Sequence, residues 1–157
     1  MDNLGLASGG GIIRDKNGAW LAGFARAIDT ATSVEAELWA VRDGLQLCKT
    51  MGIQALKVEL DARIVVDWLV NPLRTNLHHS LLISDCRYLV TTFPEVRIKH
   101  CFREVNHCAG RLAKAGARLY KDFVVFEYPF LEVVLPLLYD YVGVFFERLR
   151  PNSDVCS

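Results

Sequence analysis

The sequence has no excess of charge of either sign and no cysteine pairing pattern. Its 18 Lys and Arg residues balance 18 Asp and Glu residues, so the formal net charge is +0 and overall charge provides no attraction for nucleic acid. The five cysteines are odd in number and include no C-x-x-C pair, which argues against a disulfide framework and indicates reduced thiols in an intracellular protein. Any affinity for nucleic acid must therefore come from a local patch.

A secretory signal peptide and a membrane-spanning run are also missing from the pattern. The first residues show no basic region followed by an apolar run. Residues 123–149 form the most apolar segment, but its uninterrupted apolar runs are shorter than the roughly 20 residues needed to cross a bilayer. Acidic residues and prolines interrupt it at Glu127, Pro129, Glu132, Pro136, Asp140 and Glu147. We expect residues 121–157 to form an apolar C-terminal tail that packs on the domain body or on a protein partner, without membrane contact.

What the sequence does contain is an alternation of strand and helix patterns, in a length that fits about one domain. Residues 9–27 read as two strands, because Asn17-Gly18 supplies the positive-φ pair of a tight turn. The spacing then predicts a helix from Thr32 to Gly52. Further strands are predicted at 55–61 and 95–102, and further helices at 62–70, 79–93 and 106–120. This order predicts a mixed α/β sheet with helices on its faces.

Two carboxylates occupy positions that suit a catalytic or metal-binding role. Glu37 lies in the first turns of the long predicted helix, and Asp61 lies at the carboxyl end of a strand, the edge where open α/β sheets usually carry their sites. A purely structural explanation is also available for each residue. Glu37 is favoured electrostatically near a helix N-terminus, and Asp61 can cap the helix that follows it.

Five blocks of the sequence, taken together, resemble the plant-type ribonuclease H-like domain, which is also found attached to the reverse transcriptases of retroelements. The blocks are "GGGIIRDKNGAWLAGF", "EAELWAVRDGL", "VELDARIVVDWL", "ISDCRYLVTTF" and "REVNHCAGRLAKAGA", and they follow the family order and spacing from about Asn3 to Tyr120. The resemblance implies a ribonuclease H-like domain over residues 1–120, with a five-stranded mixed sheet flanked by helices. It also implies hydrolysis of the RNA strand of RNA–DNA hybrids.

The resemblance further implies a site in which four carboxylates hold two Mg²⁺ ions, since Mg²⁺ prefers oxygen ligands. Glu37 and Asp61 fall on two of these family positions, whereas Gly110 stands where the fourth acid belongs. The strand that carries the first acid would lie upstream of Met1, so we expect an N-terminally truncated domain whose sheet is incomplete between the hairpin and strand 55–60. We therefore expect impaired cleavage. The alternative is a catalytically inactive module that binds nucleic acid or protein, or a retroelement remnant.

Residues around the last block are candidates for contact with nucleic acid. Their basic or amide side chains follow helical spacing and could reach phosphates, although a solvated helix face explains the same pattern. The candidates are Arg103, Asn106, Arg111 and Lys114. Two His-Cys pairs, at residues 100–101 and 107–108, also raise the possibility of a zinc site, but their spacing matches no common zinc motif.

Overall fold

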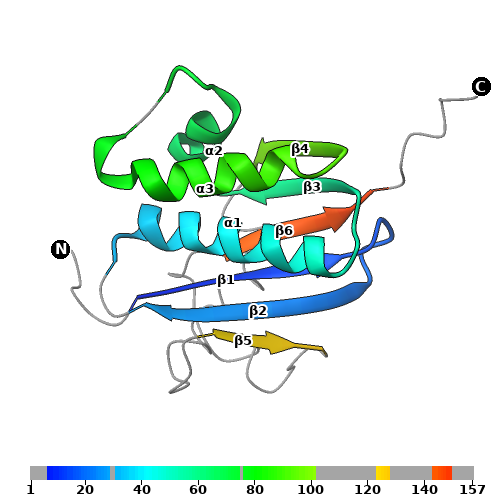
Figure 1. The fold of residues 1–157 in the computed structure, drawn as a ribbon. Helices are drawn as coiled ribbons and strands as arrows, with labels where there is room; N and C mark the ends of the chain where they lie inside the picture. The colour runs from blue at the N-terminus through cyan, green and yellow to red at the C-terminus, as the bar shows by residue number, and fades with distance from the viewer. Residues whose placement is uncertain (1–6, 29–30, 75, 102–122, 128–142, 150–157) are drawn as a thin grey trace, which may run out of the picture.

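The computed structural model describes residues 7–28, 31–74, 76–101, 123–127 and 143–149 (Figure 1). These residues form one six-stranded sheet in the order β4-β3-β6-β1-β2-β5. Its strands are β1 (Ala7–Arg14), β2 (Trp20–Ile28), β3 (Ala55–Leu60), β4 (Glu95–His100), β5 (Phe123–Phe126) and β6 (Gly143–Arg148). The predicted mixed α/β sheet is thereby confirmed.

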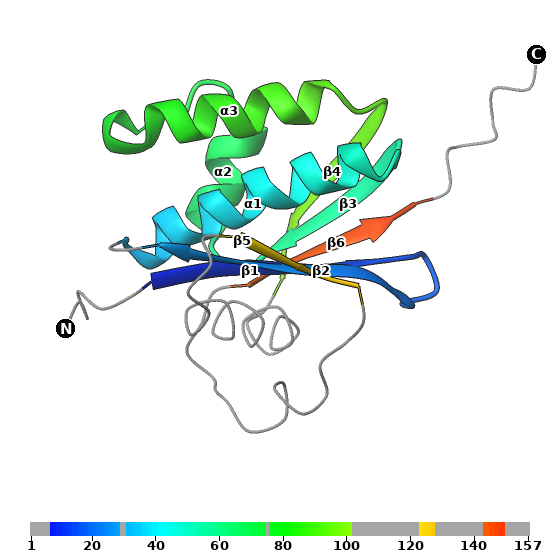
Figure 2. The ribbon, with the colours of Figure 1, turned by 60° about the horizontal axis from the view of Figure 1, so that its bottom comes forward.

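Three helices lie together on one face of this sheet (Figures 1 and 2). They are α1 (Ser33–Thr50), α2 (Arg63–Val70) and α3 (Ser80–Thr91), with a short 3₁₀ turn at Leu77–His79 ahead of α3. The apolar stripe predicted for the long helix faces the alternating apolar residues of β3, which makes one core between helix and sheet. Its central members are Leu38, Val41, Leu45, Leu56, Val58 and Leu60, all fully buried.

The predicted hairpin is confirmed: β1 and β2 pair antiparallel over their whole length. Gly18 at the turn has a φ of 82°, a left-handed conformation that glycine adopts without a Cβ penalty. The side chain of Asp15 stabilises the turn, because its Oδ1 accepts hydrogen bonds from the backbone N–H groups of Asn17 at 2.8 Å and Ala19 at 2.9 Å.

The strand–helix–helix–strand unit from β3 to β4 also follows the sequence prediction. β3 and β4 are parallel, with Leu56 opposite Val96 and Leu60 opposite His100. A parallel pair requires a crossover, and α2 and α3 provide it. Both helices begin and end within two residues of their predicted bounds. The helix predicted at 106–120 lies outside the described residues.

The expectation of an incomplete sheet is wrong, because β6 lies between β1 and β3 where the gap was predicted. It runs parallel to β1 and antiparallel to β3. Val144 and Phe146 alternate along β6 and are fully buried, so the strand adds apolar surface to the central core. Two segments of the apolar tail, Phe123–Phe126 and Gly143–Arg148, are therefore strands of the same sheet. Within the described part of the chain, no helix combines the length and apolar character needed to cross a bilayer.

Candidate functional site

The first turns of α1 hold Glu37 against the sheet. Thr32 caps the helix predicted to begin there, with its Oγ1 accepting a hydrogen bond from the backbone N–H of Glu35 at 3.2 Å. Gly9 of β1 lets the helix approach closely, since a Cβ at this position would lie 2.5 Å from the carbonyl oxygen of Ala36. Glu37 follows directly and is only 1% exposed.

Asp61 comes directly after β3 and meets Glu37 at this edge of the sheet. Oε1 of Glu37 accepts a hydrogen bond from the backbone N–H of Ala62 at 3.2 Å. The Asp61 side chain is close enough to the Glu37 carboxyl group to raise its pKa. This bond places the Glu37 carboxyl group of α1 beside the backbone of the residue that follows Asp61, at the edge where the sequence positions both acids.

The pKa of Glu37 lies well above its usual value. The pKa of Glu37 is raised from 4.5 to about 9, first by burial and then by the neighbouring Asp61 side chain and its negative charge. The backbone N–H groups of Ala62 and Asp61 act in the opposite direction but do not outweigh burial. The raised pKa therefore favours the protonated form of Glu37 at neutral pH.

The backbone around Asp61 is held by the end of β4. The carbonyl oxygen of Asp61 lies 3.0 Å from Nε2 of His100, and the carbonyl oxygen of Leu60 accepts a hydrogen bond from the N–H of Cys101 at 2.7 Å. Burial raises the pKa of the Cys101 thiol to about 12, so it is not a thiolate at neutral pH. These bonds fix the position of Asp61 relative to the sheet.

The donors at this site suit a hard cation. Glu37 and Asp61 present carboxylate oxygens, and Mg²⁺ is commonly bound by one or two carboxylates together with waters and substrate phosphates. Binding would require Glu37 to lose its proton. The described residues contain no group of three or more His, Cys, Asp or Glu side chains placed to hold a metal ion, which also gives the zinc alternative no support there. The four predicted nucleic-acid contacts, Arg103, Asn106, Arg111 and Lys114, and also Gly110, lie outside the described residues.

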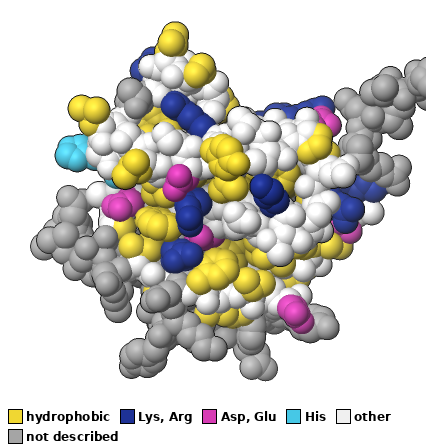
Figure 3. Space-filling view, viewed as in Figure 1, with side chains coloured by type: hydrophobic (Ala, Val, Ile, Leu, Met, Phe, Trp, Pro, Cys, Tyr) yellow, Lys and Arg dark blue, Asp and Glu magenta, His cyan; other side chains and the backbone are white. Residues whose placement is uncertain are grey.

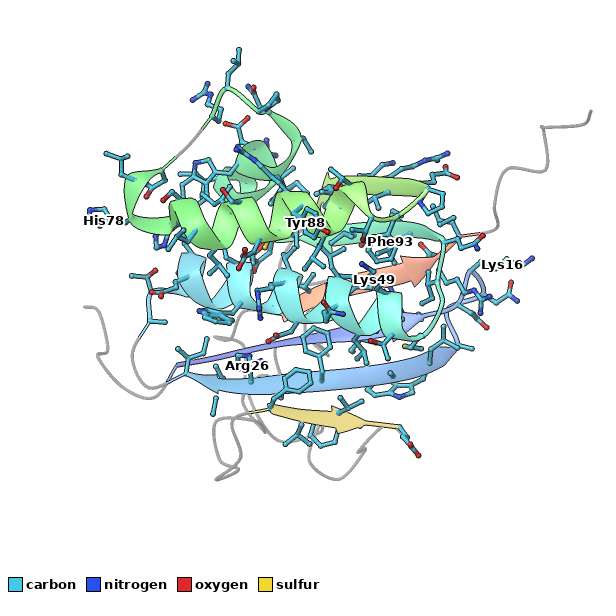
Figure 4. All side chains as sticks on the ribbon, in the orientation of Figure 1. Lys16, Arg26, Lys49, His78, Tyr88 and Phe93 are labelled. Atoms are coloured by element: carbon cyan, nitrogen blue, oxygen red, sulfur yellow. The ribbon has the colours of Figure 1, made fainter. Side chains whose placement is uncertain are left out.

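α1 carries a second buried acid, Asp43, which the sequence pattern alone would place on a solvated helix face. Asp43 is 5% exposed and binds Arg26 of β2 through two hydrogen bonds, of 2.5 and 3.0 Å. The Arg26 guanidinium also lies 5.1 Å from the ring centroids of both Trp39 and Phe123 (Figure 4). Helical spacing offered a signal, because position 43 lies on the same helix face as two alanines, three and seven residues earlier, that are buried.

Comparison with known proteins agrees with the family resemblance of the sequence blocks. The family described as Reverse transcriptase-like matches residues 2–116. The Arabidopsis thaliana protein named "Putative ribonuclease H protein At1g65750" is 34% identical over 125 residues, which cover 80% of this chain but 20% of that protein. The chain thus spans about a fifth of the length of this relative.

Two solved structures share the fold. RNase H1 of the halophilic archaeon Halobacterium salinarum superposes with a TM-score of 0.64 at 21% identity, covering 71% of this chain and 96% of that one. The N-terminal RNase H domain of a Mycobacterium tuberculosis protein gives a TM-score of 0.56 at 19% identity, covering 71% and 91%. With the family match, the fold and the Glu37–Asp61 pair at the expected sheet edge, the chain belongs to the Reverse transcriptase-like family as a ribonuclease H-like domain.

Proposed function

We propose that this domain binds RNA–DNA hybrids at the sheet edge that carries Glu37 and Asp61, and that it hydrolyses the RNA strand slowly with Mg²⁺. The observation that carries the proposal is the hydrogen bond between the Glu37 carboxyl group and the N–H of Ala62, which holds Glu37 of α1 beside Asp61 at the end of β3. The family membership and the relative named as a ribonuclease H protein support the same reaction.

The charges at this edge set the expected rate. Mg²⁺ bound here would supply Lewis-acid stabilisation of charge on phosphate oxygens. Glu37 and Asp61 together provide at most two negative charges, and only about one while Glu37 keeps its proton. Two Mg²⁺ ions would bring four positive charges, so their mutual repulsion is offset poorly before substrate phosphates arrive. We therefore expect weak metal binding and slow cleavage that rises with pH.

The helix-covered face offers a less suitable surface for nucleic acid. Figure 3 shows basic, acidic and apolar side chains interspersed there. Arg42, for example, lies 3.5 Å from Asp85 and 3.8 Å from Asp43, so its charge is offset locally. Phosphate binding is favoured by clustered positive charge, so a face on which charges of both signs alternate attracts nucleic acid weakly.

The test is cleavage of a fluorescent RNA–DNA hybrid by the wild-type chain and by Asp61→Asn, with Asp85→Asn as the matched control. Asp85 is 60% exposed on α3 and takes no part in the pair. We expect slow Mg²⁺-dependent cleavage that Asp61→Asn abolishes and Asp85→Asn leaves unchanged. Hybrid binding, followed by anisotropy, should persist in Asp61→Asn. Cleavage that survives Asp61→Asn would show that another site is responsible.

A second candidate is a nucleic-acid-binding module without hydrolysis. The protonated, buried state of Glu37 favours it, because a neutral acid is a poor ligand for Mg²⁺. This candidate predicts hybrid binding that weakens with salt, with no cleavage at any Mg²⁺ concentration or pH. The same assay, run at pH 7 and pH 9, separates the two functions.

A further inference from the structure

The tip of the β1–β2 hairpin presents an asparagine that is followed by a glycine. Asn17 and Gly18 are both exposed, and the neighbouring Lys16 lies at the outer end of the hairpin in Figure 4. A Cβ built on Gly18 would meet no described atom within 4 Å, so the space beside its backbone nitrogen is open. The carboxamide of an asparagine can react with the backbone nitrogen of the next residue, and glycine hinders that reaction least. The hairpin tip therefore holds the two groups of a deamidation reaction side by side.

The structure describes three asparagines, and their side chains differ in freedom. Oδ1 of Asn71 accepts a hydrogen bond at 3.1 Å from the N–H two residues later, and the next residue is a proline, which has no N–H to react. Oδ1 of Asn76 accepts a similar bond at 2.9 Å, and a bulky leucine follows it. The carboxamide of Asn17 has no hydrogen-bond partner among the described residues. Of these three, Asn17 combines a free carboxamide with an unhindered neighbour.

Backbone hydrogen bonds hold the reacting nitrogen in place while the turn is closed. The N–H of Gly18 donates to the carbonyl oxygen of Asp15 at 3.0 Å, and the N–H of Asp15 donates to the carbonyl oxygen of Ala19 at 2.8 Å. Oδ1 of Asp15 accepts from the N–H groups of Asn17 and Ala19. The Gly18 nitrogen must lose its proton and turn toward Cγ of Asn17, so the turn has to open before reaction. Opening at an exposed hairpin tip costs far less free energy than unfolding the domain.

We propose that Asn17 is a site of spontaneous deamidation and that opening of the turn at residues 15–19 controls its rate. The backbone nitrogen of Gly18 attacks Cγ of Asn17, the new C–N bond closes a five-membered imide, and the side-chain nitrogen leaves as ammonia. Water then opens the imide. Hydrolysis at the former side-chain carbonyl gives aspartate, whereas hydrolysis at the former backbone carbonyl gives isoaspartate, whose main chain is one carbon longer. Water is the co-reactant, no group is oxidised or reduced, and the reaction does not require nuclease activity.

Either product changes the hairpin tip. Both place a second carboxylate beside Asp15, and isoaspartate also lengthens the connection between Arg14 and Trp20, which pair where β1 ends and β2 begins. Trp20 packs against the apolar cluster that contains Ile12 and Phe126. We therefore expect deamidation to change the surroundings of Trp20 while the two strands stay paired.

The experiment incubates the full-length chain at pH 7.4 and 37 °C and digests samples at intervals. Mass spectrometry measures the gain of about 1 Da at each asparagine, and methylation by a protein isoaspartyl methyltransferase detects isoaspartate. Asn71 and Asn76 are internal controls within the same chain. We expect Asn17 to convert about tenfold or more faster than either control, with isoaspartate among its products.

Asp15→Ala tests whether the turn controls the rate. The variant loses the side-chain acceptor of two N–H groups but keeps the buried core, so the turn should open more often and Asn17 should convert about fivefold faster. Asp67→Ala removes a carboxylate that is 44% exposed on α2 and should leave the rate at Asn17 unchanged. Conversion of Asn17 no faster than that of Asn76, or equal rates at Asn17 in the wild type and Asp15→Ala, overturns the proposal.

Discussion

Replacing Glu37 by Gln should stabilise the protein above neutral pH and flatten its dependence of stability on pH. The pKa of Glu37 is raised from 4.5 to about 9 in the folded protein, chiefly by burial. Between these two values the folded state keeps a proton that the unfolded state has lost. The stability that this proton provides is complete below pH 4.5 and is lost as pH rises toward 9.

The size of the effect follows from linkage. A difference of one bound proton changes the free energy of unfolding by about 1.4 kcal/mol for each pH unit, so raising the pH from 6 to 8 should cost the wild type up to about 3 kcal/mol. Gln has the shape of protonated Glu. It can accept from the N–H of Ala62 without a titrating proton, so this loss should disappear in Glu37→Gln.

Urea unfolding between pH 5 and pH 9, in EDTA and followed by tryptophan fluorescence, measures the difference. Asp85→Asn is the control for removal of an acidic group at an exposed position. We expect the wild type and the control to lose stability in parallel as pH rises, while Glu37→Gln stays nearly constant. Parallel profiles for wild type and Glu37→Gln would refute the assignment of a protonated, buried Glu37.

Two further predictions concern charged groups that hold elements together. Arg87 donates to the backbone carbonyl groups of residues 68, 71 and 74 and so anchors the end of α2. Arg87→Ala should therefore lower the free energy of unfolding, obtained from urea midpoints, by about 2–4 kcal/mol. The control Arg97→Ala removes an exposed ion pair and should change the same quantity by about 0.5 kcal/mol or less. Asp43→Asn should cost about 1–3 kcal/mol in thermal or urea unfolding, since it breaks a buried pair with Arg26, and equal effects of Asp43→Asn and Asp85→Asn would contradict that role.

Local signals in the sequence were sufficient for most of the elements. The Asn17-Gly18 turn, the Thr32 cap and the alternation of residues 55–60 each depend on neighbours within a few positions, and the structure contains all three features. The meeting of Glu37 and Asp61 was also predictable, because the start of a helix and the end of a strand share one edge in this fold class. Local chemistry and a known topology were enough for the pair.

Contacts between residues far apart in the sequence could not be predicted from local patterns. The Asp43 side chain looked like one more charge on a helix, and only its partner on β2 explains why burial is tolerated. Such pairing depends on which strand lies under the helix, and no spacing within the helix specifies that. The raised pKa of Glu37 has the same origin, since it arises from packing against the sheet.

The position of β6 shows the limit most clearly. The apolar character of the tail predicted packing on the body or on a partner, but it carries no information about which edge or gap of a sheet a strand will join. The gap between β1 and β3 exposes two sets of backbone groups and an apolar helix surface, so leaving it empty would cost far more than ordering a short strand. The gap is filled by Val144 and Phe146 of β6, and Gly44 of α1 leaves room for the Phe146 ring. β6 is antiparallel to β3, so it begins at the end of β3 that precedes Asp61. β6 thus stabilises the core, whereas Glu37 and Asp61 come from α1 and from the end of β3, so we expect fold stability and catalytic strength to be separable in this protein.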